Sequence, residues 1–558
     1  MDDKEGFSNE IWAYALKNAI EFGKTNAGVV IPKLFQHGLE KDKIKDVIQE
    51  INKIVSEVNK MSKEERGSKL KSYEKYAIEH EQKEKDLPEL QNVGKKPVFR
   101  LAPFPSGALH IGNARTYLLN AIYSERYDGK TLLVMDDTIG SSEKPIAPDA
   151  YKLIEESFKW LGVKYAKPVI YKSDRVKIYY DYALQLIEKD KAYVCHCSQS
   201  DFKKLKDSGK DCPCRNIEIK KQLERWKKLF KMKEGSAVLR LKTGMQNPNP
   251  AFRDRVLFKI SDREHPRVKK KYRVWPTLEM SWAVDDHLLG ITHIIRGNDL
   301  VMETQVEKFI WDIFGWEKPE VIHNGLIRLE GVGAKISKSK AQKEVKSGLF
   351  IGCDDPRTWS MQSLERRGFK PEAMREFVKE IGLTKQDVVV PIESFYAINR
   401  KMIDSSADRY SFVENPEELE LYKAPKIGFV SVGVHPDKKE TRKIAIDKIF
   451  VSKKDLNSFK GKEVRLIHLF NVFLDSYGVG KFLSIENKDI PKINWVSDGL
   501  KTKILMPDGS WISGLAENAI SKLKPGSIIQ FERFGFVRFD GKKKDKKDEA
   551  YEFWFAHR

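Results

Sequence analysis

The sequence predicts a multidomain protein in which a helical N-terminal domain precedes an α/β domain with an open parallel sheet, and an all-β region ends the chain. Three observations support this order. Apolar residues recur at helical spacing before residue 60, a strand–helix–strand pattern covers residues 98–135, and short alternating strands with frequent turns follow residue 395. Because 558 residues exceed the usual size of one domain, we expect several.

The first predicted domain, residues 1–94, is helical. Its clearest helix carries one apolar stripe, because apolar residues step by three and four along the chain. The stripe consists of Ile44, Val47, Ile48, Ile51, Ile54, Val55 and Val58. Such a stripe is typical of packing inside a helical bundle, and we interpret it in that way and not as a functional surface.

A strand–helix–strand unit follows. Residues 98–101 form a short apolar strand that ends in a Pro/Gly loop at 102–107, and a helix is expected from 113 to 127. A second apolar strand, 131–135, is followed by Asp136. Strands joined in this way are parallel, and open parallel sheets bind ligands beyond the carboxyl ends of their strands. We therefore expect the ligand site at this loop and at Asp136.

Composition and charge narrow the class of protein. The chain carries 101 Lys and Arg residues against 81 Asp and Glu, a formal net charge of +20. This excess favours contact with a polyanion such as nucleic acid, although a solvated Lys/Glu surface is an equal alternative. No stretch has the length of a membrane span, and the first residues lack the apolar core of a secretory signal. We expect a cytoplasmic protein without membrane contact.

Four of the five cysteines lie in one short segment, which favours a metal site over a disulfide scaffold. Cys195 and Cys197 form one close pair, and Cys212 and Cys214 form a second, with fourteen residues between the pairs. Two pairs of thiolates can hold a structural zinc ion tetrahedrally. C-x-C pairs are less typical than C-x-x-C, so four reduced cysteines without metal are the alternative. Cys353 stands apart and is expected to pack.

Two short strings have the residue types that phosphate chemistry requires. Residues 110–113, His-Ile-Gly-Asn, open the expected helix, where backbone amides favour an anion and glycine permits close approach. Lys335 and Lys338 follow a Gly-rich segment, and their ammonium groups can neutralise charge on a transferring phosphate. Each string alone is weak. A lone His at a helix start is usually a cap, and a Lys-rich chain forms such strings by chance.

A third string, Gly129-Lys130-Thr131, nearly fits the phosphate-binding P-loop pattern. The first glycine of that pattern is missing, and the string precedes a strand, whereas a P-loop opens a helix. We interpret Gly129 as the C-cap of the preceding helix.

Taken together, the motifs resemble those of a known enzyme family. Strings 110–113 and 335–339 are similar to the HIGH and KMSKS signatures of class I aminoacyl-tRNA synthetases, in the same order and separated by an insertion. Further similarities to the glutamyl and glutaminyl members are R-L-A-P at 100–103, M-D-D-T at 135–138, D-D-H-L-L-G-I-T-H-I-I-R-G at 285–297, D-D-P-R at 354–357 and Q-F-E-R-F-G-F at 530–536. The resemblance covers residues 95–558, and the helical N-terminal part suits archaeal glutamyl-tRNA synthetases.

The resemblance implies how the chain is divided. A Rossmann-like class I catalytic domain would occupy 95–195 and 276–345, interrupted at 196–275 by an insert that binds the tRNA acceptor end and carries zinc. A helical connector would follow at 346–395, and antiparallel β-barrels that bind the anticodon would fill 396–558.

The implied reaction is activation of L-glutamate by ATP and Mg²⁺ to glutamyl-adenylate, followed by transfer to the terminal ribose of tRNA(Glu), and in some relatives of tRNA(Gln). A monomer is expected. The implied catalytic residues are His110, Asn113, Lys335 and Lys338, and the ATP-binding residues add Pro103, Gly112 and Ser337. The implied substrate-binding residues are Arg100, Ala102, Ser106, Asp136, Leu278, Trp282 and Arg296.

Within this set, the resemblance implies that Asp136 holds the α-amino group of the substrate and that Arg100 lies near its carboxylates. Arg296 would pair with the side-chain carboxylate, where glutaminyl enzymes have an uncharged residue. A guanidinium suits a carboxylate better than a neutral amide, and Arg296 is therefore the main reason to expect glutamate. As an isolated residue, Arg296 could equally form a structural ion pair.

The sequence departs from the family pattern in two places. Leu278 stands where the pattern Y-P-x-Y-D-F has the tyrosine that touches the substrate, so the pocket must be completed otherwise, with Trp282 as one candidate. Asn113 replaces the last His of the HIGH signature, and it keeps a hydrogen-bond donor but cannot carry a positive charge.

Two alternatives follow from these departures. A glutaminyl-tRNA synthetase is the first, and a noncatalytic tRNA-binding relative is the second. The loss of the tyrosine favours the noncatalytic alternative, whereas the intact string 335–339 argues against it. We expect tRNA phosphates to contact the basic stretches 220–221, 225–228 and 267–273, although a solvated surface is an equal alternative for any single lysine.

Overall fold

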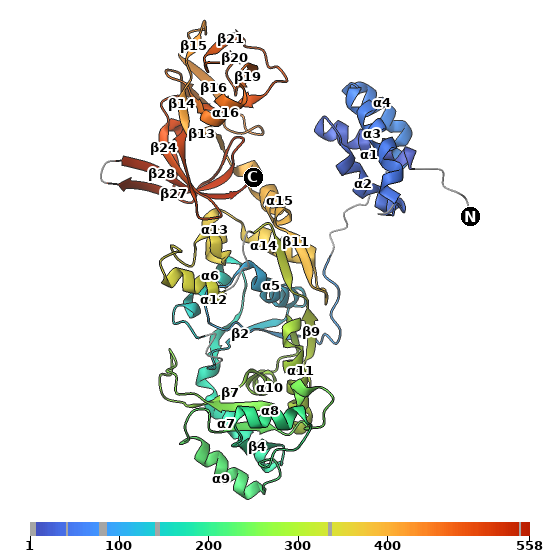
Figure 1. Ribbon diagram of the computed structural model, residues 1–558, viewed down its shortest axis with the longest axis vertical. Coiled ribbons are helices and arrows are strands. Elements are labelled where there is room, and N and C mark those ends of the chain that lie inside the picture. Colours follow the sequence, from blue (N-terminus) through green and yellow to red (C-terminus); the bar gives the residue numbers. More distant parts are fainter. Residues whose placement is uncertain (1–6, 41–42, 77–85, 140–144, 333–337, 546–547) are drawn as a thin grey trace, which may run out of the picture. The chain divides into compact units, whose positions relative to one another are not determined.

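The protein is described from a computed structural model of the 558-residue chain, over residues 7–40, 43–76, 86–139, 145–332, 338–545 and 548–558 (Figure 1). The chain divides into two compact units, Met1–Lys85 and Asp86–Arg558, which are taken separately. Across these ranges, no helix combines the length and the apolar character that crossing a bilayer requires.

The first unit is a helical bundle, as predicted. Its helices are α1 Ser8–Phe22, α2 Ala27–Leu34, α3 Ile44–Lys60 and α4 Lys63–Tyr73, with the 3-10 turns η1 Phe35–His37 and η3 Glu74–Tyr76. Ile51, Ile54 and Val58 of the apolar stripe are buried in one cluster with α1, which confirms the interpretation of the stripe. Arg66 of α4 donates to the carbonyl oxygen of Val58 at 2.9 Å and to that of Ala19 at 3.1 Å, so one side chain joins three helices.

The second unit begins with a parallel sheet in the strand order β3-β2-β1-β8-β9. The strands are β1 Val98–Leu101, β2 Lys130–Met135, β3 Ala166–Tyr171, β8 His293–Gly297 and β9 Glu320–Asn324, and the helices are α5 Ile111–Arg126, α6 Ala150–Trp160, α7 Val176–Glu188, α10 Leu278–Leu288 and α11 Val301–Phe314. Leu133 and Met135 of β2 enter one core, whereas Leu132 and Val134 enter another. Both faces of the sheet are therefore covered, and the predicted strand–helix–strand unit is confirmed.

The turn between α5 and β2 differs from the prediction. Asp128, and not Gly129, has the left-handed backbone, with φ at 47°. A Cβ at Gly129 would lie 2.5 Å from the carbonyl oxygen of Pro97, so glycine is required there for close approach. The string that Gly129 opens leads into β2, in agreement with the rejection of a P-loop.

An antiparallel sheet in the order β4-β5-β6-β7 lies in the chain between β3 and β8, at the position of the expected insert. Its elements are β4 Ala192–Cys195, α8 Gln199–Asp207, α9 Ile219–Leu229, β5 Val238–Leu241, β6 Val256–Ile260 and β7 Val274–Pro276.

The connector that follows β9 contains β10 Ile327–Glu330, α12 Lys338–Lys346, α13 Met361–Arg367, α14 Pro371–Ile381, β11 Val388–Pro391 and α15 Ile392–Ile403. Its last helix thus extends past the predicted boundary at 395. Short 3-10 turns of the unit are η4 Lys172–Asp174, η5 Pro250–Phe252, η6 Asn298–Leu300, η7 Pro356–Thr358, η8 Asp404–Ser406 and η9 Asn518–Lys522.

The rest of the chain is rich in strands, as predicted. Its sheets have the orders β12-β26-β27-β28-β24-β25-β13, β15-β21-β20-β19-β22, β14-β18-β23 and β16-β17. The elements are β12 Arg409–Tyr410, β13 Phe412–Glu414, β14 Pro416–Glu418, β15 Leu421–Tyr422, β16 Phe429–Gly433, β17 Thr441–Ala445, β18 Phe450–Ser452, α16 Lys453–Ser458, β19 Lys462–Leu466, β20 Asn471–Leu474, β21 Gly480–Ser484, β22 Lys492–Ile493, β23 Trp495–Val496, β24 Leu500–Leu505, β25 Trp511–Ala516, β26 Ile528–Phe531, β27 Gly535–Asp545 and β28 Asp548–His557. The pairs β12/β26, β15/β21, β19/β22 and β24/β28 are parallel, so the expectation of antiparallel sheets holds only for other pairs.

Candidate active site and metal centre

The carboxyl edge of the parallel sheet gathers the predicted substrate residues. Loop 102–107 follows β1, Asp136 follows β2, and Arg296 lies in β8. The backbone amide of Asp136 donates to the carbonyl oxygen of Pro103 at 3.0 Å, which joins the loop to the end of β2. Lys172, which the sequence analysis did not identify, follows β3 at the same edge.

Arg100 projects from β1 and is buried. Its Nε and Nη2 donate to the two carboxylate oxygens of Asp286 at 2.5 and 3.1 Å. The guanidinium also lies over the indole ring of Trp282, 3.5 Å from the ring centroid. The guanidinium of Arg100 therefore forms a bidentate ion pair with Asp286 and a cation–π contact with Trp282.

Asp136 is paired with a lysine. The Nζ atom of Lys172 lies 2.9 Å from Oδ1 of Asp136, donates to Oγ of Ser281 at 2.8 Å, and lies 3.4 Å from the ring centroid of Trp282. The Lys172 side chain is fully buried. Burial lowers the pKa of Lys172, while the charge of Asp136 opposes that effect.

Arg296 forms the structural ion pair that the sequence left open. Its Nη1 donates to Glu307 at 3.0 Å, its Nη2 binds the second oxygen of the same carboxylate, and Nη2 also donates to Thr304 at 2.5 Å. Burial raises the pKa of Glu307. Burial disfavours the charged form of Arg296, but the charge and the hydrogen bonds of Glu307 favour that form, and the net effect is a raised pKa of Arg296.

Two further buried carboxylates hold the edge in place. Asp137 accepts from the backbone amide and the hydroxyl of Ser173, at 2.8 and 2.7 Å. Asp285 accepts from Nε of Arg175 at 2.7 Å and from the hydroxyl of Tyr179 at 2.6 Å. Burial raises the pKa of both carboxyl groups. Side chains from four segments are thereby fixed around Lys172 and Asp136.

The His-Ile-Gly-Asn string forms the N-terminus of α5, as predicted. Oδ1 of Asn113 accepts from the backbone amide of His110 at 2.9 Å, so Asn113 caps the helix. A Cβ at Gly112 would lie 3.2 Å from the imidazole of His110, which explains why glycine suits this place. A cavity of about 350 Å³ is lined by His110 and by Val345 of α12, the helix that begins within string 335–339.

Of the other predicted residues, some lack a described side chain, and the rest lie in or beside the core near Trp282 and the loop after β1. Lys335 and Ser337 lie outside the described residues, and Lys338 begins α12 without a described side chain. Leu278 is the first residue of α10 and packs, half-buried, on the core that contains Trp282. Ala102 packs on the same core, and Ser106 is buried in the loop after β1.

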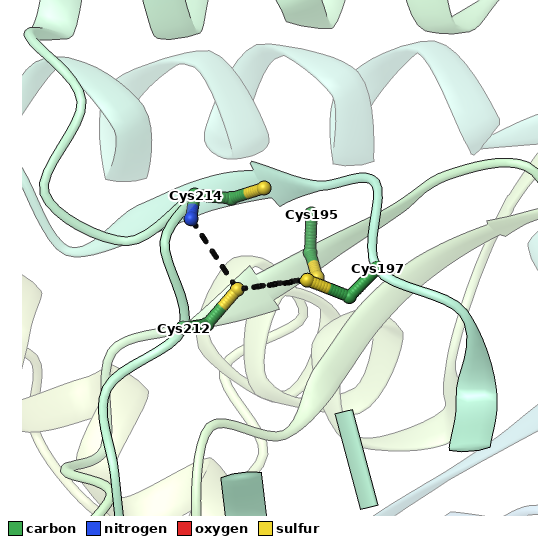
Figure 2. A group of neighbouring side chains, drawn as sticks. All are labelled: Cys195, Cys197, Cys212 and Cys214. Carbon is green, nitrogen blue, oxygen red and sulfur yellow. Dashed lines mark hydrogen bonds between the residues drawn. The ribbon is translucent and has the colours of Figure 1, made fainter. Parts of the chain in front are cut away.

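The four clustered cysteines converge at the end of β4 (Figure 2). Their sulfur atoms all lie within 4.8 Å of one another, and Sγ of Cys212 is 3.7 Å from that of Cys195 and 3.4 Å from that of Cys197. Zinc–sulfur bonds of about 2.3 Å in a tetrahedron place the sulfur atoms about 3.8 Å apart. The spacing therefore fits zinc. Gln222 of α9 donates to the carbonyl oxygen of Cys214 at 2.7 Å and braces the second pair.

Comparison with known proteins identifies the family. The catalytic-domain model of the class I tRNA synthetases (E and Q) matches residues 97–405, and two anticodon-binding-domain models of that class match 407–486 and 486–540. Similar proteins named glutamate–tRNA ligase come from Methanocaldococcus jannaschii, 40% identical over 98% of this chain and 100% of the relative, and from Pyrococcus abyssi, 42% identical over 94% and 96%. A third, from Pyrococcus furiosus, is 42% identical over 96% and 98%. The chain belongs to the class I glutamyl and glutaminyl tRNA synthetases.

The synthetase catalytic domain thus begins one residue before β1 and ends just after α15. Two buried residues of this domain, Lys172 and Glu307, were not predicted from the sequence. Lys172 could have been found, because a lone cation directly after the third apolar strand lies at the ligand edge. Glu307 gave no such signal, since only the packing of α11 on β8 brings it to Arg296.

In the basic stretches of this synthetase, two arginines make close hydrogen bonds to the protein, and the lysines are exposed, with Lys221 and Lys269 in surface ion pairs. Arg267 donates to Ser173 at 2.7 Å and to Asp174 at 3.0 Å, and Arg273 pairs with Asp262 at 2.5 Å. Arg267 thus joins the insert to the segment after β3, whereas Arg273 joins two parts of the insert to each other. In contrast, the lysines of α9 at 220, 221, 227 and 228 and those at 269–271 are exposed.

Proposed function

We propose that this chain is a glutamate–tRNA ligase, which activates L-glutamate with ATP and Mg²⁺ and transfers it to tRNA(Glu). The observation that carries the proposal is the alignment of 94 to 98% of the chain with archaeal proteins named for that reaction. A noncatalytic or glutaminyl role receives no comparable support. We keep the cytoplasm as the proposed location because the proposed substrates occur there, and a monomer stays a prediction.

In this proposal, ATP binds at the N-terminus of α5. Pro103, His110, Gly112, Asn113, Lys335, Ser337 and Lys338 form the proposed nucleotide site. The substrate α-carboxylate attacks the α-phosphorus, and pyrophosphate leaves. His110, Asn113, Lys335 and Lys338 stabilise the charge that develops, so that catalysis consists of positioning and electrostatics and requires no general base. The cavity shared by His110 and α12 supports this arrangement.

The amino acid would bind beyond β1 and β2. Asp136 takes the α-amino group, Arg100 lies near the carboxylates, and Ala102, Ser106, Leu278 and Trp282 shape the pocket. Arg296 is proposed to favour a side-chain carboxylate, and its bidentate pair with Glu307 means that it acts from a fixed position. Leu278 would contribute only apolar surface to this pocket, because it lacks the hydroxyl of the family tyrosine.

The insert and the strand-rich region would contact tRNA. Cys195, Cys197, Cys212 and Cys214 would hold a structural zinc ion, which the sulfur spacing supports. Such a site stabilises the hairpin that carries the exposed lysines of α9. The acceptor end is proposed to bind these lysines, and the anticodon is proposed to bind barrels formed by the C-terminal sheets.

The direct test is charging of unfractionated archaeal tRNA with labelled glutamate and, separately, with labelled glutamine, in the presence of ATP and magnesium. Glutamate charging alone supports the proposal, and separated acceptors then show whether tRNA(Gln) is used as well. Charging with glutamine would replace the proposal with a glutaminyl enzyme. Charging with neither would indicate a noncatalytic relative.

A further inference from the structure

Lys172 is a buried cation that the proposed mechanism does not use. It leaves the end of β3 and enters the ligand edge of the sheet with no exposed surface. Its ammonium is surrounded by a carboxylate oxygen of Asp136, the hydroxyl of Ser281 and the face of Trp282. A buried ammonium is stable only with such partners, because leaving water is costly for a charge.

The pairing of Lys172 differs from that of the two nearby arginines. Arg100 and Arg296 each bind both oxygens of a protein carboxylate. Lys172 lies within 2.9 Å of one oxygen of Asp136. An ammonium on a four-carbon stem can also redirect its donors, whereas a guanidinium is planar and rigid. Of these three cations, Lys172 therefore gives up the fewest contacts with its carboxylate partner when a ligand binds that carboxylate.

We infer that Lys172 determines specificity for glutamate by exchanging ion partners. When the α-ammonium of the substrate binds Asp136, the Lys172 ammonium binds the side-chain carboxylate of the substrate. The exchange replaces the ion pair between Lys172 and Asp136 with two new ones. Asp136 then pairs with the α-ammonium of the substrate, and Lys172 pairs with its side-chain carboxylate, so both protein charges keep a partner. The inference rests on the proposed function, since it takes the amino acid to bind at Asp136.

The exchange discriminates against glutamine. A neutral amide that takes the same place would leave the buried Lys172 ammonium without a carboxylate in contact while Asp136 is occupied. An ammonium in that position loses its counterion and cannot recover it from water. Ser281 and Trp282 keep the Lys172 side chain at the edge during the exchange, because neither contact depends on Asp136.

The test is equilibrium binding of glutamate and of glutamine to the full-length chain and to Lys172→Met, measured by calorimetry. Loss of the ammonium is expected to weaken glutamate binding about tenfold or more, whereas glutamine binding should become no weaker and should tighten if anything, because no unpaired ammonium is left behind. The matched control is Lys242→Met, because Lys242 also pairs with an aspartate, Asp190, at 2.6 Å but lies in the insert. The control should keep the wild-type ratio of the two affinities.

An equal loss for both amino acids in Lys172→Met, or an unchanged ratio, overturns the inference. If Lys172→Met does not melt cooperatively, Lys172→Gln replaces it, because its amide can still donate to Ser281 but carries no charge, and this variant must lose the preference for glutamate. Charging is measured in parallel on the wild-type chain. If the wild-type chain charges tRNA with glutamate but Lys172→Met leaves the ratio of the two affinities unchanged, only the inference about Lys172 is wrong. If Lys172→Met shifts the ratio of the two affinities as expected but the wild-type chain charges no tRNA, only the proposed function is wrong.

Discussion

Asp137 accepts two hydrogen bonds from Ser173, one from the backbone amide at 2.8 Å and one from the hydroxyl at 2.7 Å. These residues directly follow Asp136 and Lys172 in the chain. The two hydrogen bonds therefore fix how far the end of β2 lies from the end of β3, and with it the geometry of the Lys172–Asp136 ion pair.

Ser173→Ala is expected to lower the free energy of unfolding by about 2 kcal/mol, because a buried carboxyl group loses one of its donors. The same change should raise the KM for glutamate, since Asp136 is less firmly placed. Urea denaturation and charging kinetics measure the two effects. Ser208→Ala is the control, because Ser208 is exposed on the insert. A variant with wild-type stability would show that the hydroxyl of Ser173 contributes nothing beyond the backbone bond.

Acid is expected to destabilise the attachment of β28 to the connector. Nε2 of His557 accepts from the Asn399 amide at 2.9 Å, and the Asn399 oxygen already accepts from the backbone of Lys370 at 2.9 Å. Nε2 therefore faces a donor and must be unprotonated. Burial lowers the pKa of His557 to about 4. Since an unfolded histidine has a pKa of about 6.5, the unfolded chain binds the proton first as the pH falls.

Stability is thus expected to fall between about pH 6.5 and about 4, by about 3 kcal/mol if the whole shift is expressed. His557→Gln keeps an acceptor for Asn399 without a titrating group, so its stability should depend less steeply on pH in this window. Urea midpoints at about pH 7 and about pH 4.5 measure the difference. His468→Gln, at an exposed position, should behave as the wild type does. Parallel pH curves for all three proteins would contradict the assignment.

The cysteine cluster is expected to hold one zinc ion per chain. Cys212→Ser removes a sulfur that lies within 3.7 Å of two others and should abolish the bound metal and lower the melting temperature. Elemental analysis of the purified protein gives the metal content. Cys353→Ser serves as the control, because Cys353 is remote in sequence from both pairs and should leave the zinc in place. Wild-type protein without metal would contradict the prediction.

Reversal of charge on α9 is expected to weaken tRNA binding. Lys227→Glu with Lys228→Glu removes two exposed cations from the insert, and the slope of log affinity against log salt should fall by about one for each tRNA phosphate that is no longer neutralised. Filter binding over a range of salt concentrations measures this slope. Lys152→Glu reverses an equally exposed lysine on α6 and is expected to have a smaller effect. Equal weakening in both variants would indicate nonspecific attraction by net charge.

Local patterns were sufficient to predict the elements that place the site. The strand at 98–101 was predicted at its observed residues, and α5 begins two residues earlier than expected, because apolar runs bounded by Pro and Gly are local signals. The four cysteines were predicted to converge, and they do. Composition alone would favour a loop in the charged segment 541–550, whereas β27 and β28 continue through most of it. Paired backbones tolerate charged side chains wherever these face solvent.

The pairing of charges in the site could not be predicted in the same way. Arg100 and Arg296 were expected to face the substrate, yet each already binds a carboxylate, Asp286 or Glu307. Such partners are chosen by the packing of helices on the sheet, which no spacing in the sequence encodes. The place of Lys172 at the ligand edge could be predicted from the strand before it, but its burial and its pairing with Asp136 could not.

The position of β28 has a consequence for synthesis of the chain. In the order β12-β26-β27-β28-β24-β25-β13, this strand joins β27 on one side to β24 on the other. It is translated after every other strand of its sheet. The two halves of the sheet therefore remain separate, with open edges, until residues 548–557 leave the ribosome. A chain stalled before residue 548 would expose those edges, so nascent chains of this protein are expected to need chaperone protection late, and not early, in translation.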